Sequence, residues 1–272
     1  MQTTARGTLS GALDLGLREL VAMVGGGGKT GALRLLAGEL AATGSKVIVA
    51  TTTAMLLREL VAAGSVVLEA GMPALVGGLR RALTEQRIVG AAAALGVDGK
   101  VIGLSPTTVD ELWARGTNTL ADYLIVEADG SRGKPLKAFG PHEPKVPSAA
   151  TIIVQVAGLD AIGTQLDDEH VHRAELIATT LDVPLGSTVT SSVFVGCLRE
   201  QVRYLAQRWG SARIVTVLNK AEGLQRVRLG LEVASDLLGT PEDGGDRPVT
   251  EAVVVASLNE GRFIRVCSAK GQ

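Results

Sequence analysis

The chain has few aromatic residues and few cysteines, and neither sign of charge is in excess. Aromatic residues make up 3% of its 272 residues, so the core that its 46% of hydrophobic residues can form must be mainly aliphatic. Such a core is typical of parallel strands covered by helices on both faces. The two cysteines, Cys197 and Cys267, lack metal-site spacing, and we expect reduced thiols in a cytoplasmic protein.

Other absences restrict the possible partners. The formal net charge of -1 argues against nonspecific nucleic-acid binding as the main activity. No apolar run is long enough to cross a bilayer, and residues 1–10 lack the apolar core of a signal peptide. We therefore expect no nucleic-acid partner, no membrane and no export, while the oligomeric state stays open.

The most informative stretch is a glycine run near the N-terminus. Residues 21–24 are apolar and predict a buried strand, Gly25, Gly26, Gly27 and Gly28 follow, and Lys29-Thr30 begins a segment with helical apolar spacing. A strand, a glycine loop ending in Lys-Thr and a helix form the context of a phosphate-binding loop. We expect successive N–H groups and the helix N-terminus to cradle phosphates. Lys29 would reach the outer phosphates, and the Thr30 hydroxyl would bind Mg²⁺.

This loop is shorter than the standard motif. The position six residues before Lys29 holds Met23, and the first glycine is Gly25. Ligases with Gly-x-x-Gly-Lys-Thr have a loop of this kind. A flexible glycine turn with a surface lysine is the alternative interpretation. We expect Lys29 on a surface loop, so that Lys29→Ala abolishes triphosphate binding and leaves the fold intact.

A later strand is predicted to deliver acids to the same place. After Asp122, residues 123–126 form an apolar run that is followed by Glu127, Asp129 and Gly130. In an extended strand the two carboxylates would point to one face. A hard cation prefers oxygen ligands, so Thr30, Glu127 and Asp129 are the predicted Mg²⁺ site, with Lys29, Glu127 and Asp129 as the catalytic candidates. A turn with solvated acids is the alternative.

The next segment, residues 131–147, is rich in proline and basic residues, which excludes a regular helix or an inner strand. An ordered basic loop here could hold a phosphate or another oxyanion, and His142 could transfer protons or bind a metal. A solvated, proline-stiffened connection is the alternative. The candidate substrate or phosphate residues, including two farther along the chain, are Arg132, Lys134, Lys137, His142, His172 and Arg173.

A strand over 213–218 is predicted to deliver Asn219-Lys220-Ala221-Glu222. In guanine-nucleotide proteins Asn-Lys-x-Asp after a strand reads the base, so Asn219 and Lys220 are nucleotide-binding candidates. Glutamate replaces the aspartate here, which leaves adenine and guanine both open.

The remaining pattern predicts the other elements. Strands are expected at 46–50, 66–68, 151–156 and 252–256, with an edge strand at 263–266. Thr53 is expected either to cap the helix at 54–63 or to belong to a ligand site with Thr51 and Thr52. Residues 71–103 are expected to form a helix and one or two short strands, and 239–248 a surface loop. Other helices are expected at 9–20, from Ser105-Pro106, from 167–169 with His170, His172 and Arg173 in its first turn, and from about 190.

Together these elements predict an α/β protein, a P-loop NTPase-like three-layer sandwich with a mainly parallel sheet and helices on both faces. We expect a single nucleotide-binding domain over residues 1–272 that includes the proline-rich basic loop at 131–147.

Several motifs in this order resemble the YqeC family, accessory proteins for selenium-dependent molybdenum hydroxylases. The resemblance covers most of the chain. Its motifs are Val24–Thr30, Thr51–Thr53, Val126–Arg132 with Pro135–Lys137, His142–Pro144, Gly158–Asp160, His172-Arg173 and Asn219-Lys220. It implies a setting, the maturation of a molybdenum–selenium cofactor, in which a hydroxylase or its cofactor is the partner.

Glu127-Ala-Asp-Gly130 is also similar to the Glu-x-x-Gly motif of GTPase metal-insertion chaperones, whose Cys/His motifs are missing here. Three functions are compatible with the sequence. The chain is an NTPase maturation factor with ATP or GTP and Mg²⁺, an ATP-dependent kinase or ligase acting on an acidic small molecule, or a nucleotide sensor without catalysis.

Overall fold

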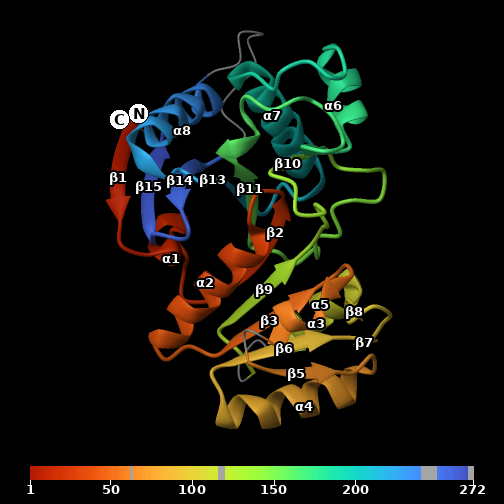
Figure 1. Ribbon diagram of the computed structural model, residues 1–272. Helices are drawn as coiled ribbons and strands as arrows, with labels where there is room; N and C mark the ends of the chain where they lie inside the picture. Colours follow the sequence, from red (N-terminus) through yellow and green to blue (C-terminus); the bar gives the residue numbers. More distant parts are fainter. Residues whose placement is uncertain (62–63, 116–119, 240–249, 269–272) are drawn as a thin grey trace.

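The computed structural model describes residues 1–61, 64–115, 120–239 and 250–268, and a ten-stranded sheet runs through this part of the chain (Figure 1). Its strand order is β1-β15-β14-β13-β11-β2-β9-β3-β6-β5. The strands from β14 to β5 pair in parallel, whereas β15 is antiparallel to both of its neighbours. The strands are β1 (Gln2–Arg6), β2 (Glu19–Gly25), β3 (Val47–Thr51), β5 (Ser65–Leu68), β6 (Ile88–Ala92), β9 (Tyr123–Glu127), β11 (Ile152–Gly158), β13 (Arg213–Asn219), β14 (Ala252–Ser257) and β15 (Arg262–Cys267).

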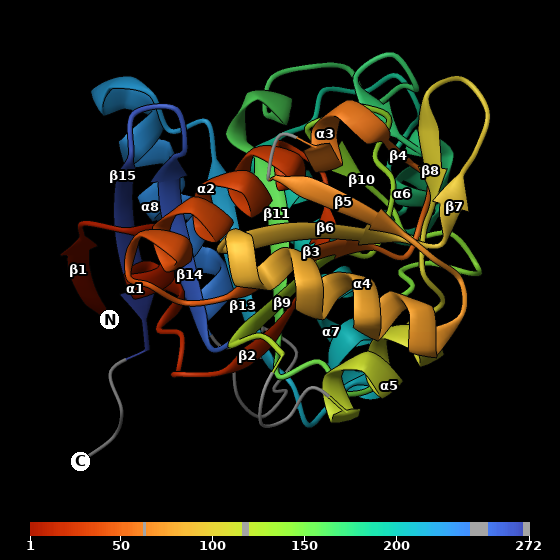
Figure 2. The ribbon, with the colours of Figure 1, turned by 90° about the horizontal axis from the view of Figure 1, so that it is seen from below.

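Helices cover both faces of this sheet (Figure 2). One face packs against α1, α2 and α3, and the other packs against α4, α5, α6, α7 and α8. This arrangement is the α/β, P-loop NTPase-like three-layer sandwich that the sequence predicted. The helices are α1 (Leu9–Leu13), α2 (Lys29–Ala42), α3 (Leu57–Val61), α4 (Met72–Glu85), α5 (Pro106–Arg115), α6 (Ala174–Leu181), α7 (Ser191–Arg208) and α8 (Gly223–Leu238).

The central strand β2 shows why the core is aliphatic. All seven of its residues are buried, with Val21 and Met23 on the face of α2, and Leu20, Ala22 and Val24 on the opposite face. Because successive side chains of a strand alternate between faces, a continuous apolar run is needed where both faces are covered. In the described part of the chain, no helix is both long and apolar enough to cross a bilayer.

Two small sheets lie outside the main sheet. β10 (Leu136–Lys137) pairs with β12 (Val171–His172), and β8 (Lys100–Ile102) pairs with β4 (Met55–Leu56) and β7 (Ala94–Leu95). The structure corrects two expectations in this region and excludes one of the two alternatives for Thr53. The helix expected at 54–63 begins only at Leu57, residues 88–102 form three strands instead of one or two, and Thr53 caps no helix.

The helix expected from 167–169 is also wrong, because Val171 and His172 pair with β10 and Arg173 has a φ of 63°. That left-handed conformation interrupts any helix, so α6 starts at Ala174, and His170 and His172 precede it.

Both ends of the chain differ from expectation. The helix expected at 9–20 ends at Leu13, where Asp14 takes a φ of 55°, and residues from Glu19 belong to β2. β15 is not an edge strand, because β1 pairs with its residues from Phe263 to Cys267. The helices predicted from Ser105-Pro106 and from about 190 are confirmed, and Ser105 and Thr190 accept hydrogen bonds from N–H groups in their first turns. The loop expected at 239–248 lies, except for Gly239, outside the described residues.

Candidate functional site

The glycine loop connects β2 to α2 and lies against β11 and the proline-rich loop. Gly25, Gly27 and Gly28 have φ values of 97°, 68° and 120°. A Cβ atom on Gly27 would lie 2.1 Å from the backbone nitrogen of Gly158, and one on Gly25 would lie 2.3 Å from the carbonyl oxygen of Val156. Glycine is therefore required at these positions by the close approach of two backbones as well as by φ.

The N–H groups of this loop are used more fully than the sequence suggested. Gly25 donates to Asp129, Gly26 to the Val156 carbonyl and Gly27 to the Lys134 carbonyl. The expected nest of free N–H groups is therefore wrong for these three residues in this conformation. The N–H groups at the start of α2 have no partner within the helix, and Gly28, directly before α2, is exposed. The helix N-terminus is thus the part of the loop that an anion can reach.

Lys29 does not lie on the surface, which corrects the expectation from the sequence. Its side chain is 3% exposed, its Nζ donates to the Gly25 carbonyl at 2.5 Å, and it lies 3.0 Å from Asp129 Oδ1. Lys29→Ala would remove a buried ion pair, so it would not leave the fold undisturbed.

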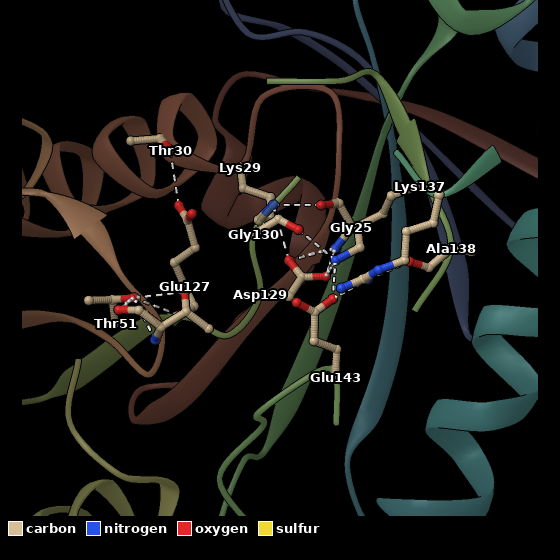
Figure 3. Close-up of polar contacts among 12 residues, drawn as sticks. Gly25, Lys29, Thr30, Thr51, Glu127, Asp129, Gly130, Lys137, Ala138 and Glu143 are labelled. Atoms are coloured by element: carbon tan, nitrogen blue, oxygen red, sulfur yellow. Dashed lines mark hydrogen bonds and ion pairs between the residues drawn. The ribbon is translucent and has the colours of Figure 1, made fainter. Parts of the chain in front are cut away.

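Thr30 and Glu127 come together as predicted. The Thr30 hydroxyl donates to Glu127 Oε2 at 2.9 Å, although the two residues lie on different elements, α2 and β9 (Figure 3). Burial raises the pKa of Glu127, and Lys29 and the Thr30 hydrogen bond only partly oppose this effect. A cation beside the carboxylate would favour its ionised form, so this hydroxyl–carboxylate pair suits Mg²⁺, which prefers oxygen ligands and keeps several waters.

Asp129 points away from this pair, because β9 ends at Glu127. The fully buried Asp129 accepts from Gly25 N–H at 2.9 Å and lies 3.0 Å from both Lys29 Nζ and Lys137 Nζ. The expectation that the two acids share one face is wrong. Asp129 holds the loop and its lysine, and in this conformation it lies apart from the Thr30–Glu127 pair.

The ion pairs continue from Asp129 toward α6. Lys137, whose side chain is completely buried, also lies 2.7 Å from Glu143 Oε2, and Arg173 Nη1 lies 2.6 Å from that same oxygen. Hydrogen bonds and charge from Arg173 and Lys137 outweigh desolvation and lower the pKa of Glu143 to about 2. We call Lys29, Asp129, Lys137, Glu143 and Arg173 the ion-pair chain.

Asn219 and Lys220 reach the same edge of the sheet but are engaged with the protein. The Asn219 amide donates to the Gly27 carbonyl at 2.8 Å and accepts from Leu258 N–H, and Lys220 Nζ lies 2.5 Å from Asp160 Oδ2. Asn219 thus fixes the glycine loop from the side of β13. Their role as base-reading residues stays a prediction, as does that of the glycines in phosphate binding.

The candidate substrate or phosphate residues separate in the structure. Arg132, Lys134, His172 and Arg173 line a cavity of about 490 Å³, whereas Lys137 is buried and is not part of its lining. His142 is exposed on the loop and His170 pairs with Asp167 at 2.7 Å, and of the three histidines His172 alone lines this cavity among the described residues. Within the described residues, no cluster of three His, Cys, Asp or Glu side chains could hold a metal.

Sequence reasoning missed two features of this site. In the sequence Asp160 is only one member of a motif, yet its Oδ1 is buried without a hydrogen-bond partner in the described structure. Lys137 was expected to contact a substrate, and its depth has no local signal, because the burial results from β10 pairing with a strand far along the chain.

The site consists of a strand, a glycine loop ending in Lys-Thr and a helix, at the carboxyl edge of a mainly parallel sheet. An acid from a neighbouring strand accepts a hydrogen bond from the threonine of this loop. This combination defines a P-loop NTPase-like protein. The sequence model of the family described as YqeC protein matches residues 21–175. A protein of Escherichia coli (strain K12), named uncharacterized protein YqeC, is 32% identical over 190 residues, which cover 69% of this chain and 71% of the relative. The chain belongs to the YqeC family.

Solved structures of FtsY are also similar in fold. Chloroplast FtsY from Physcomitrella patens has a TM-score of 0.44 and 17% identity, and the match covers 92% of this chain and 63% of the moss protein. FtsY from Mycoplasma mycoides has a TM-score of 0.43 and 14% identity, covering 94% and 67%. At this level of similarity we draw no functional conclusion from these proteins.

Proposed function

We propose that the chain binds a nucleoside triphosphate with Mg²⁺ at the start of α2 and hydrolyses it. The observation that carries this proposal is the contact between Thr30 Oγ1 and Glu127 Oε2 beside the exposed N-terminus of α2. The helix N-terminus favours an anion, and the adjacent hydroxyl and carboxylate are suited to its cation.

Lys29 has a defined task in this proposal. Its ammonium group now neutralises the buried Asp129, and Lys137 neutralises the same carboxylate from the other side. Lys29 can therefore turn toward the outer phosphates while Asp129 keeps a cationic partner and the Gly25 N–H. Bound Mg²⁺, held by Thr30 and Glu127, would neutralise charge on the β- and γ-phosphates. A water molecule would then attack the γ-phosphorus. A bond from the water oxygen to this phosphorus forms while the bond to the β–γ bridging oxygen breaks, which releases nucleoside diphosphate and phosphate.

The cellular role that we propose rests on the family resemblance. It is an accessory function in the maturation of a selenium- and molybdenum-containing hydroxylase, with the hydroxylase or its cofactor as the partner. Turnover by the chain alone would then be slow and would rise when that partner is added. The base remains open between adenine and guanine, since Asn219 and Lys220 are at the right edge of the sheet but Glu222 replaces the usual aspartate.

Release of inorganic phosphate from ATP and from GTP tests the proposed reaction. We expect Mg²⁺-dependent turnover that Thr30→Ala reduces by about 10- to 100-fold and that Thr30→Ser largely restores, because serine keeps the hydroxyl. Turnover of the Thr30→Ala variant equal to that of the unchanged chain would exclude this site as its source. Nucleotide binding without any turnover, with and without the partner, would favour a sensor.

A further inference from the structure

The cavity beside α6 is a neighbour of the glycine loop but is separate from it. Its walls come from the proline-rich loop, the β12 segment and the first turn of α6 (lining residues Gly130, Arg132, Lys134, Glu143, Asp168, His172, Arg173, Glu175 and Leu176). Lys134 belongs to both places, because its side chain lines the cavity and its carbonyl accepts from Gly27 N–H. With about 490 Å³, the cavity has the size of a small-molecule site.

The charges in this cavity leave cations free for a ligand. Glu143 is neutralised by Lys137 and Arg173, and Asp168 accepts from the first N–H of α6. Arg132, by contrast, is exposed and has no ion-pair partner among the described residues, and Lys134 Nζ donates only to the Glu169 carbonyl. Glu175 is the one carboxylate of the lining without such an engagement in the described structure.

The charged groups that act on His172 are mainly cationic. Its pKa is lowered by burial and then by Arg173, Lys137 and Arg132, and Glu143 opposes this only in part. Asp168 and Glu175, which line the same cavity, do not reverse this direction. The lowered pKa favours the neutral imidazole, which leaves the positive charge to the guanidinium and ammonium groups.

A second, mainly apolar cavity of about 500 Å³ adjoins the first, and Leu176 forms part of the wall of both. Phe139 and Tyr204 line it with ring centroids 6.0 Å apart, and Arg208 lies over the Tyr204 ring. The two rings are tilted by 50° and pack on each other, so a ligand ring would pack against this pair instead of between its members. Among the described lining residues of this cavity, Arg208 is the one cation that could pair with an anion.

We propose that the two cavities form one site for a second ligand, a small organic oxyanion that carries an aromatic ring. Arg132, Lys134 and Arg173 would hold its phosphate or carboxylate, and Phe139 and Tyr204 would hold its ring. Arginine suits this task because its planar fork matches such anions. The proposal goes beyond nucleotide binding and would stand even if the glycine loop bound no nucleotide.

Calorimetric titration of the full chain with phenyl phosphate tests this site, with inorganic phosphate as the matched probe without a ring. We expect phenyl phosphate to bind about tenfold more tightly than inorganic phosphate, because the ring is removed from water. Arg132→Ala should weaken its binding by about tenfold or more. Leu176→Asp, which places a negative charge at the shared wall, should do the same. Arg81→Ala, an exposed arginine of α4, is the control and should change nothing.

The same titration with a saturating non-hydrolysable Mg·triphosphate separates this site from the loop. Phenyl phosphate binding that persists supports the second site. Binding that disappears places the probe in the glycine loop and overturns the proposal while sparing the proposed function. Equal affinity for the two probes, or unchanged binding by both Arg132→Ala and Leu176→Asp, would also overturn it. A triphosphate that does not bind would reject the nucleotide site alone.

Discussion

Glu127 is the residue in which function and stability conflict. Burial raises its pKa, so the ionised form that a cation requires is the form that the folded chain holds least well. A raised pKa in the folded state means that the carboxyl contributes its full stability below its unfolded pKa and loses it as pH rises through the folded value.

Glu127→Gln should therefore raise the melting temperature of the nucleotide-free chain at pH 8, and this gain should vanish near pH 4, where the unchanged Glu127 is protonated. The same variant should lose Mg²⁺-dependent nucleotide binding. Thermal unfolding followed by circular dichroism across this pH range measures the first effect. A variant that is less stable than the unchanged chain at pH 8 would contradict our account of Glu127.

The pKa of Glu143 is shifted in the opposite direction to that of Glu127. Its pKa is lowered to about 2, so its contribution to stability is present above the unfolded pKa and is lost as pH falls through the folded value. We expect Glu143→Gln to reduce the free energy of unfolding by about 2 kcal/mol at pH 7, a figure discounted from the shift because the side chain is partly exposed. Urea unfolding at pH 7 and near pH 2 checks this, and a difference that stays constant over this range would contradict it.

The sequence predicted the position of the glycine loop well, but it did not predict the hydrogen bonds that hold the loop. The run from Gly25 to Thr30 predicted its position, its helix and the partnership of Thr30 with Glu127, because each depends on local pattern and on strands sharing a carboxyl edge. The hydrogen bonds of Gly26 and Gly27 depend on β11 and on the proline-rich loop, far along the chain. No spacing within the motif encodes those contacts.

Two glycines of this element should respond differently to alanine. Gly27→Ala places a Cβ 2.1 Å from the backbone of Gly158 at a φ of 68° and should destabilise the chain by several kcal/mol. Gly31→Ala, in the first turn of α2, meets nothing within 4 Å and should be neutral or should stabilise by up to about 1 kcal/mol. Chemical denaturation of both variants measures the contrast, and equal effects would show that the loop does not pack on β11 as described.

At the scale of the whole molecule, the alternation of apolar runs and helical patterns predicted the three-layer architecture. It did not predict the strand β1 at the edge of the sheet. β1 is exposed at all five positions, and its polar residues give no strand signal, so only its pairing with β15 makes it a strand. The short strands β4, β10 and β12 were not predicted for the same reason, because a two-residue strand is defined only by its pairing with another strand.

Removing residues 1–7 should therefore test whether nucleotide binding at the glycine loop depends on the β1 edge of the sheet. β15 would become an open edge, and we expect a loss of about 1–3 kcal/mol in the free energy of unfolding together with a greater tendency to aggregate. Nucleotide affinity should stay unchanged, because β1 lies at the end of the sheet, five strands from β2. Denaturation and light scattering of the truncated chain measure these effects. Loss of nucleotide binding in a truncated chain that remains folded would contradict this division.

The central claim is that a Mg·triphosphate binds where β2 gives way to α2. Its most direct measurement is calorimetric titration of non-hydrolysable ATP and GTP analogues into the unchanged chain and into Lys29→Met, with and without Mg²⁺, after circular dichroism has shown that the variant is folded. The account predicts Mg²⁺-dependent binding of at least one analogue and a loss of about 10- to 150-fold in affinity for Lys29→Met, the equivalent of a charged hydrogen bond of about 1.5–3 kcal/mol. Equal affinity of the unchanged chain and of Lys29→Met for the analogues would contradict it, as would an affinity that is the same with and without Mg²⁺.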